Sequence, residues 1–180
     1  MAGRPRDRAA KPRDVWSFVE YSTQRLAENP DLDIDATRLI LTLNRASDVI
    51  TYDLESTVHR PQGHTWAAFR LLFVTWLAGP FDATTAARLT GMSRAAVSSL
   101  TKTLVADGLL ERRPDPHDGR SVELALTDAG QGAMRRIFAE HNRREEQWAA
   151  ALTKDEQAQL VALLSKLIQG QHTFDARGRN

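Results

Sequence analysis

The sequence has 180 residues, of which 42% are hydrophobic and 26% are charged, and its formal net charge at neutral pH is +1. This composition suits a soluble domain with a sizeable core, and no run of apolar residues is long enough for a membrane-spanning helix. The absence of cysteine excludes disulfides, thiolate nucleophiles, thiol redox sensing and cysteine-ligated zinc. The basic N-terminus is not followed by the apolar segment of a secretory signal, and we expect a cytoplasmic location.

The first 63 residues predict an arm and two helices. Residues 1–13 hold five basic side chains and no apolar run, so we expect a disordered basic arm. The helix that follows ends at Asn29, because the residue before a proline avoids the α-helical region. A longer helix spans residues 35–59, where apolar residues recur at steps of three and four. Residues 60–63, which contain a proline and a glycine, end this helix.

The next segment predicts a helix with a strongly aromatic side. It runs to Gly79-Pro80, where the glycine can cap the helix and the proline cannot continue it. Four aromatic side chains fall largely on one side of this helix, and a face so aromatic must be buried. These residues are Trp66, Phe69, Phe73 and Trp76.

Two short helices with a turn between them form the next pattern. The first spans residues 83–90, and the turn contains Gly91. Ser93 can cap the second helix, because its hydroxyl can accept from the free amides of the first turn, and Gly108 ends it. A helix, a short glycine-containing turn and a second helix are the signature of a helix-turn-helix.

A β-hairpin and two further helices complete the pattern. Residues 109–113 and 121–126 predict short strands, and the proline-, aspartate- and glycine-rich segment between them suits the tip of a hairpin. Thr127 caps a long helix, and Thr153 begins a capping box for the last helix. The expected fold class is therefore mainly α with a small β-hairpin wing.

The second helix of the helix-turn-helix has two distinct sides. At 100° per residue, Val97, Leu100 and Leu104 form the core side. The small and cationic side chains elsewhere would let the helix enter a major groove about 12 Å wide and reach bases and phosphates. An ordinary solvated helix face is the alternative. The candidate DNA-binding residues here are Ser93, Arg94, Ala95, Ser98, Ser99 and Lys102.

The hairpin strengthens the DNA-binding hypothesis. Arg112, Arg113 and Arg120 converge on a short ribbon, and such a wing can place an arginine in the minor groove. Asp118 cannot usefully face phosphate, and we expect it to orient Arg120. A hairpin with ordinary surface salt bridges is the alternative, although a helix-turn-helix followed directly by a basic hairpin is less common by chance. Net charge adds little, since residues 88–120 carry six basic and four acidic side chains, a balance of +2.

These motifs together resemble the winged-helix core of the MarR family. The matching features are the helix-turn-helix, the Gly108-Leu109-Leu110 step, the wing pattern of residues 113–121 and the exit LTDAG at residues 126–130. The order of helices extends the resemblance to about residues 35–170. It implies that the recognition-helix residues contact DNA and that Asp118 and Arg120 lie at the wing tip. Gly119 and Ser99 stand where the family often has arginine, which predicts weaker phosphate contact.

The resemblance also implies a homodimer on double-stranded DNA. The first long helix and the two C-terminal helices have wider apolar stripes than a small winged domain can cover, although they could also close onto their own chain. Two recognition helices about 34–36 Å apart would read a pseudo-palindrome. The expected architecture is a winged helix-turn-helix with N- and C-terminal dimerisation helices. Its expected segments are a disordered basic arm (1–13), N-terminal helices contributing to dimerisation (14–63), a winged helix-turn-helix DNA-binding region (64–130), C-terminal dimerisation helices (131–172) and a flexible tail (173–180).

An effector site is the remaining expectation from the resemblance. In such proteins a small molecule typically binds between the dimer helices and the winged domain and alters the spacing of the recognition helices. Aromatic walls with a nearby arginine and histidine suit a small aromatic or anionic metabolite. Alternatively, the aromatic side chains are core and the arginine pairs with an acidic neighbour. The candidate effector-binding residues are His59, His64, Trp66, Phe69, Arg70 and Phe73.

No sequence pattern points to an enzyme. The five histidines offer no compact metal-ligand spacing, and we find no glycine-rich phosphate loop, nucleophile elbow or convincing pair of catalytic carboxylates. We therefore expect no metal, cofactor or catalytic activity. The leading hypothesis is a transcriptional repressor released from DNA by a small effector. A ligand-insensitive architectural DNA-binding protein and an interaction module that has lost DNA binding are the alternatives.

Overall fold

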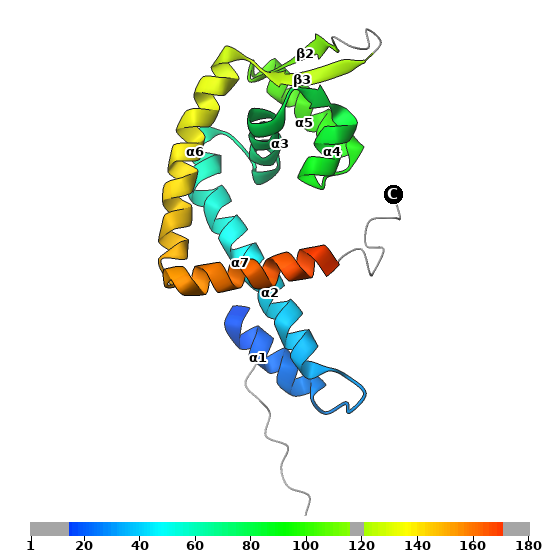
Figure 1. The fold of residues 1–180 in the computed structure, drawn as a ribbon, viewed down its shortest axis with the longest axis vertical. Coiled ribbons are helices and arrows are strands. Elements are labelled where there is room, and N and C mark those ends of the chain that lie inside the picture. The colour runs from blue at the N-terminus through cyan, green and yellow to red at the C-terminus, as the bar shows by residue number, and fades with distance from the viewer. Residues whose placement is uncertain (1–14, 116–120, 171–180) are drawn as a thin grey trace, which may run out of the picture. The chain divides into compact units, whose positions relative to one another are not determined.

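The computed structural model describes residues 15–115 and 121–170, with side chains from residue 18 onward. Figure 1 shows a mainly helical chain with one small sheet, and the expected fold class is confirmed. No helix in these ranges is both long and apolar enough to span a bilayer. The elements in chain order are α1 (Val15–Leu26), α2 (Ile34–Leu54), the π-helical turn η1 (Glu55–His59), the 3₁₀ turn η2 (Arg60–Gln62), α3 (Trp66–Ala78), β1 (Phe81–Asp82), α4 (Ala83–Thr90), α5 (Arg94–Ala106), β2 (Leu110–Pro114), β3 (Val122–Leu126), α6 (Asp128–Ala149) and α7 (Lys154–Gln169).

The chain divides into two compact units, and the first comprises residues up to 53. It contains α1 and nearly all of α2. Val19 of α1 is buried, and the guanidinium of Arg45 on α2 lies 5.4 Å from the centre of the Phe18 ring. Along α2, several large apolar side chains remain exposed, so this helix is not covered within the unit. They are Leu39, Ile40, Val49 and Tyr52.

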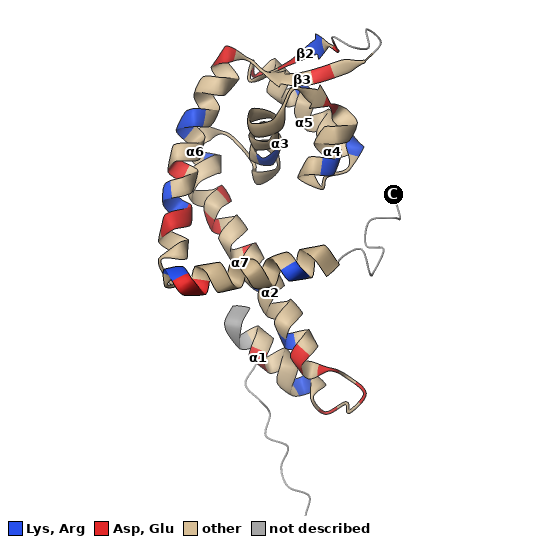
Figure 2. Ribbon diagram, viewed as in Figure 1, with Lys and Arg blue, Asp and Glu red and all other residues tan. Residues whose placement is uncertain are grey.

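The second unit, residues 54–180, is built around a winged helix-turn-helix. Its three-stranded antiparallel sheet has the order β1-β3-β2. The hairpin of β2 and β3 is the predicted wing, whereas the two-residue strand β1 is too short for its periodicity to be detected in the sequence. Helix α3, which has a single charged residue, packs against α4, α5, α6 and β3 and forms the centre of the core (Figure 2).

Helix caps place the helix-turn-helix as the sequence indicates. The Ser93 side chain accepts a hydrogen bond from the Ala96 amide at 3.2 Å and starts α5. Gly91 and Gly108 have φ angles of +68° and +70°, a left-handed backbone conformation that side chains with a Cβ rarely adopt. These two glycines therefore turn the chain into and out of the recognition helix α5.

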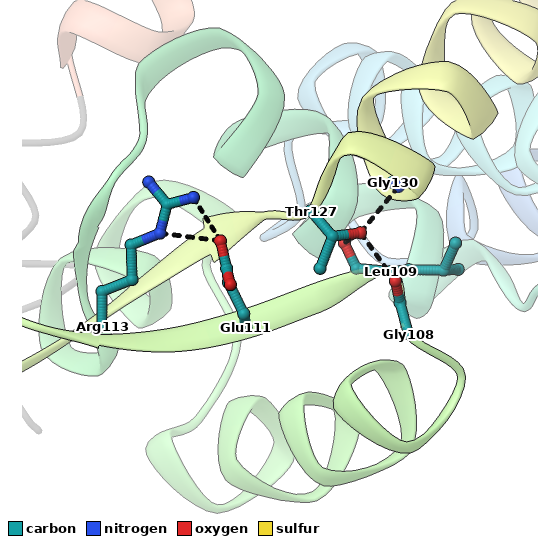
Figure 3. Close-up of polar contacts among 6 residues, drawn as sticks. All are labelled: Gly108, Leu109, Glu111, Arg113, Thr127 and Gly130. Carbon is teal, nitrogen blue, oxygen red and sulfur yellow. Dashed lines mark hydrogen bonds and ion pairs between the residues drawn. The ribbon is translucent and has the colours of Figure 1, made fainter.

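Thr127 connects the exit of α5 to the start of α6 (Figure 3). Its hydroxyl donates to the Gly108 carbonyl at 2.6 Å and accepts from the Gly130 amide at 2.9 Å, while its own amide donates to the Leu109 carbonyl at 3.1 Å. A Cβ at Gly130 would collide with the Leu109 carbonyl. The close approach of these backbones fixes where α6 begins relative to α5.

The C-terminal helix α7 starts at a complete capping box and exposes an apolar stripe. The Thr153 side chain accepts from the Glu156 amide, and the Glu156 carboxylate accepts from the Thr153 amide at 2.8 Å. The corner between α6 and α7 is held by Gln157, whose amide donates to the Ala149 and Leu152 carbonyls. None of the α7 side chains is fully buried. Its exposed apolar residues are Leu160, Val161, Leu163, Leu167 and Ile168.

Candidate nucleic-acid interface and ring cluster

Helix α5 separates its apolar and polar residues onto different sides. Val97 and Leu104 are buried in the core of the winged unit. The candidate DNA-contacting residues of this segment are all exposed, so nothing in the described chain covers them. They are Ser93, Arg94, Ala95, Ser98, Ser99 and Lys102. The helix thus presents a surface of small and cationic side chains to solvent.

The two strand arginines of the wing lie on opposite faces of the sheet. Side chains alternate along a strand, and residues paired across strands share a face. Arg112 pairs with Leu124, which belongs to the core that also contains Val97 of α5. Arg112 therefore extends from the side of the sheet that packs against α5 and is itself exposed. Arg113 pairs with Glu123 and extends from the outer side.

On the outer face of the sheet, Arg113 has acidic neighbours on its own strand and on β3. The Arg113 Nε donates to the Glu111 carboxylate at 2.7 Å, and a second guanidinium nitrogen binds the same oxygen (Figure 3). Asp82 pairs with Glu123, so Asp82, Glu123 and Arg113 form a row across all three strands. The Asp82 carboxylate caps α4, where hydrogen bonds from Thr85 and the charges of two nearby arginines hold its pKa below the ordinary value. The wing arginines are thus electrostatically unequal.

The wing tip, residues 116–120, lies outside the described residues. The expected partners Asp118 and Arg120 both belong to this segment. Their predicted roles in orienting the wing and in minor-groove contact stay predictions. The flanking residues are described, and the Asp115 amide donates to the Ser121 carbonyl at 3.0 Å, which closes the base of the tip.

Four of the six residues expected to bind an effector form a ring cluster with residues of α6. The His59 ring is fully buried and stacks on Phe69 with a centroid distance of 4.1 Å. The His141 ring on α6 lies 5.1 Å from His59 and 4.6 Å from Phe69. Further ring contacts connect the remaining members. The ring cluster consists of His59, Trp66, Phe69, Phe73, Trp76, Phe138 and His141.

The two buried imidazoles of the ring cluster have unpartnered nitrogens. Among the described residues, neither His59 ring nitrogen has a hydrogen-bond partner, and His141 Nδ1 also has none. His141 Nε2 lies 3.0 Å from the Glu145 carboxylate. Burial, with the nearby His141 and His64, lowers the pKa of His59 to about 4. Burial also lowers the pKa of His141, although Glu145 opposes this effect. Both rings are therefore neutral at neutral pH.

The sequence did not single out His141. It lies 82 positions after His59, on a charged helix, and the one local sign of a special environment is Glu145 one helical turn later. The two remaining effector candidates, His64 and Arg70, are not members of the cluster. The His64 amide donates to the His59 carbonyl. The Arg70 guanidinium lies at the helix-turn-helix, with Nη2 3.6 Å from the position of a Cβ built on Gly91.

Comparison with known proteins assigns the chain to a family. The model of the MarR family matches residues 62–121, which include α3, the helix-turn-helix and the first strand of the wing, β2. A curated relative, the uncharacterized HTH-type transcriptional regulator YwaE of Bacillus subtilis, is 30% identical over 142 residues. The match covers 79% of this chain and 83% of the relative. The chain belongs to the MarR family.

Solved structures of transcriptional regulators share the fold of this MarR-family protein. PcaV from Streptomyces coelicolor, solved in complex with its natural ligand, matches with a TM-score of 0.59 and 25% identity over 81% of this chain and 96% of PcaV. The repressor CouR, solved bound to a 23-mer DNA duplex, matches with a TM-score of 0.66 and 27% identity over 72% of this chain and 92% of CouR. The MarR-family protein is accordingly a transcriptional regulator with a DNA-binding winged helix.

Proposed function

We propose that this MarR-family regulator is a homodimeric repressor that occupies a pseudo-palindromic operator and is released by a small effector. The observation that carries the proposal is the packing together of two elements that each expose residues suited to DNA. The polar side of α5 is exposed, and Arg112 is exposed on β2, which packs against α5. A helix for the major groove and a cation for the adjacent phosphates or minor groove are therefore carried by neighbouring elements.

Each interface residue has a physical role in this proposal. Ser98, Ser99 and Ala95 are small enough to let α5 approach the base edges closely. Arg94 and Lys102 supply positive charge at the flanks, and Ser93 fixes the start of the helix. The wing contributes Arg112 and, at its tip, Arg120 held by Asp118. Arg113 contributes only where it leaves its carboxylate partner.

Exposed apolar side chains on α2 and on α7 support a dimer. Each helix keeps several large apolar residues in contact with solvent, which is costly in an isolated monomer and typical of an interface. We propose that the helices within residues 14–63 and 131–172 associate with those of a second copy, and that residues 64–130 bind DNA. A two-fold dimer would set the two α5 helices one or more helical turns of DNA apart.

The ring cluster is our proposed effector site. Its buried imidazoles have neutral rings and unpartnered nitrogens, so a ligand that hydrogen-bonds them recovers an interaction that the free protein lacks. The rings are in contact, so the ligand must separate them. That requirement ties binding to a movement of α3 against α6, which a regulator needs. The natural ligand of PcaV supports ligand control in a related fold.

A footprint on the DNA that surrounds the protein's own gene tests the proposal. The repressor should protect one symmetric site of about two helical turns, and a small-molecule screen by thermal shift should find compounds that also remove this protection. Protection of long stretches with little sequence preference would instead favour an architectural DNA-binding protein. No protection at any salt concentration would favour an interaction module.

A further inference from the structure

The outer face of the wing sheet carries a charge balance that does not suit contact with DNA. The β-sheet register places Asp82, Glu123 and Arg113 in one row, and Glu111 lies on the same face, two residues from Arg113 along β2. Apart from Asp82, whose carboxylate caps α4, these side chains have a formal charge of −1, from two carboxylates and one guanidinium. By contrast, Arg112 on the other face pairs with an apolar residue and has no ion pair within the described ranges.

Glu111 binds the Arg113 guanidinium through two nitrogens. Both the Nε and a terminal nitrogen donate to one carboxylate oxygen, so the guanidinium is oriented along the strand (Figure 3). To bind a phosphate with these donors, Arg113 must give up charge-assisted hydrogen bonds, while Glu123 repels the incoming phosphate. An exposed pair of this kind contributes little to folding stability, so its main effect is on the surface potential.

We propose that Glu111 is a positioning residue that withholds Arg113 from DNA and so limits the affinity of the wing for phosphate. This inference rests on the proposed function, since it requires that the wing binds DNA. Arg112 is then the strand arginine that contacts DNA, although the two are neighbours in sequence. Phosphate contacts dominate binding to DNA of any sequence. Keeping the Arg113 cation away from phosphate therefore weakens binding to DNA outside the operator, and the regulator spends less time there.

Neutralising Glu111 tests this directly. The probes are the duplex that the wild-type protein selects from a random library and a shuffled duplex of the same composition. The Glu111→Gln variant should bind both duplexes about two- to fivefold more tightly, and the slope of log K against log salt should steepen by about 0.9, the value of one added phosphate contact. Glu123→Gln, which removes a carboxylate from the same face but leaves the Glu111–Arg113 pair, should have a smaller effect on both quantities.

Variants with Arg113→Ala complete a double-mutant cycle with Glu111→Gln. Arg113→Ala alone should leave both affinities within about twofold of wild type, whereas Arg112→Ala should weaken both and flatten the salt slope by about one unit. In the Arg113→Ala background, Glu111→Gln should lose its effect on the salt slope. Thermal melts of all variants should stay within a few degrees of the wild type, since the pair is exposed.

Three outcomes would overturn the inference. One is an unchanged affinity and slope for Glu111→Gln. Another is a loss in Arg113→Ala as large as that in Arg112→Ala, because Arg113 would then already contact DNA. The third is a gain from Glu111→Gln that persists without Arg113, which would reflect general charge alone. If the wild-type protein binds neither duplex, the proposed function fails instead, so the two failures are distinguishable.

Discussion

The exposed side of α5 and the ring cluster between η1, α3 and α6 differ in the exposure and hydrogen bonding of their polar groups. On α5, hydroxyls and cations stay in water, where they have hydrogen bonds until another molecule replaces that water. In the ring cluster, the protein encloses two imidazoles with unpartnered nitrogens, which costs folding free energy. The exposed side of α5 can bind a partner without first lowering the folding stability. The ring cluster lowers the folding stability, which a ligand that bonds the imidazoles would raise and protonation would lower further.

The largest expected effect concerns the link between these two regions, the approach of α6 to the end of α5. Gly130→Ala places a methyl group against the Leu109 carbonyl, and backbone atoms there cannot move without displacing β2. We expect the free energy of unfolding to fall by about 2–3 kcal/mol, measured by urea titration.

Gly132→Ala is the matched control for that substitution. It lies in the same helix, and its added methyl would meet only the far end of the Arg136 side chain at 3.6 Å. Its stability should rise by about 0.5–1 kcal/mol, because alanine is the better helix former. Equal melting temperatures for the two variants would show that the α5–α6 link tolerates movement.

Acid should destabilise the ring cluster. The pKa of His59 is about 4 in the folded protein and about 6.5 in an unfolded chain, so the unfolded state binds the proton more readily. Stability is then fully present above about pH 6.5 and falls as the pH drops toward 4, by on the order of 2 kcal/mol for this residue.

Replacing His59 by phenylalanine isolates that contribution. The phenyl ring can keep the stack on Phe69 but cannot be protonated. Urea titrations between pH 7.5 and 4.5 should show a shallower loss of stability for His59→Phe than for the wild type. Parallel curves for the two proteins would mean that the His59 imidazole is not held neutral by the fold.

A smaller effect is expected from single cations on the α5 surface. Lys102→Ala should weaken binding to all duplexes by about 1 kcal/mol and reduce the salt slope by about one, as for a phosphate contact, with no change in melting temperature. Lys154→Ala on α7, also an exposed lysine, should leave DNA binding unchanged. A loss confined to one DNA sequence would instead assign Lys102 to base recognition.

We expect no release of DNA in response to a thiol oxidant. The sequence contains no cysteine, so diamide has no thiol to oxidise and should not release DNA. Release measured by fluorescence anisotropy after diamide treatment would show that another group on the protein reacts with it.

The helix-turn-helix could be predicted because its signals are local. Ser93, Gly91 and Gly108 determine caps and turns through their own chemistry, and the apolar residues of α5 repeat with the helix period. The ring cluster was predicted only in part, since His141 joins it through tertiary packing across 82 residues. The opposite faces of Arg112 and Arg113, and the position of Glu111 beside Arg113, follow from the two-residue period of the predicted strand. The pairing of Arg113 with Glu123 depends on β-sheet register, which no local pattern in the sequence encodes.

The most direct test of the central claim is selection of binding sites from random duplexes by the full-length protein. A homodimer that reads DNA through the polar side of α5 should enrich a pseudo-palindrome with half-site centres about 10 base pairs or a multiple apart. Ser98→Glu, which places a carboxylate on that surface, should abolish the enrichment while the variant stays folded. Enrichment of an asymmetric sequence, or enrichment that survives Ser98→Glu, would contradict this account.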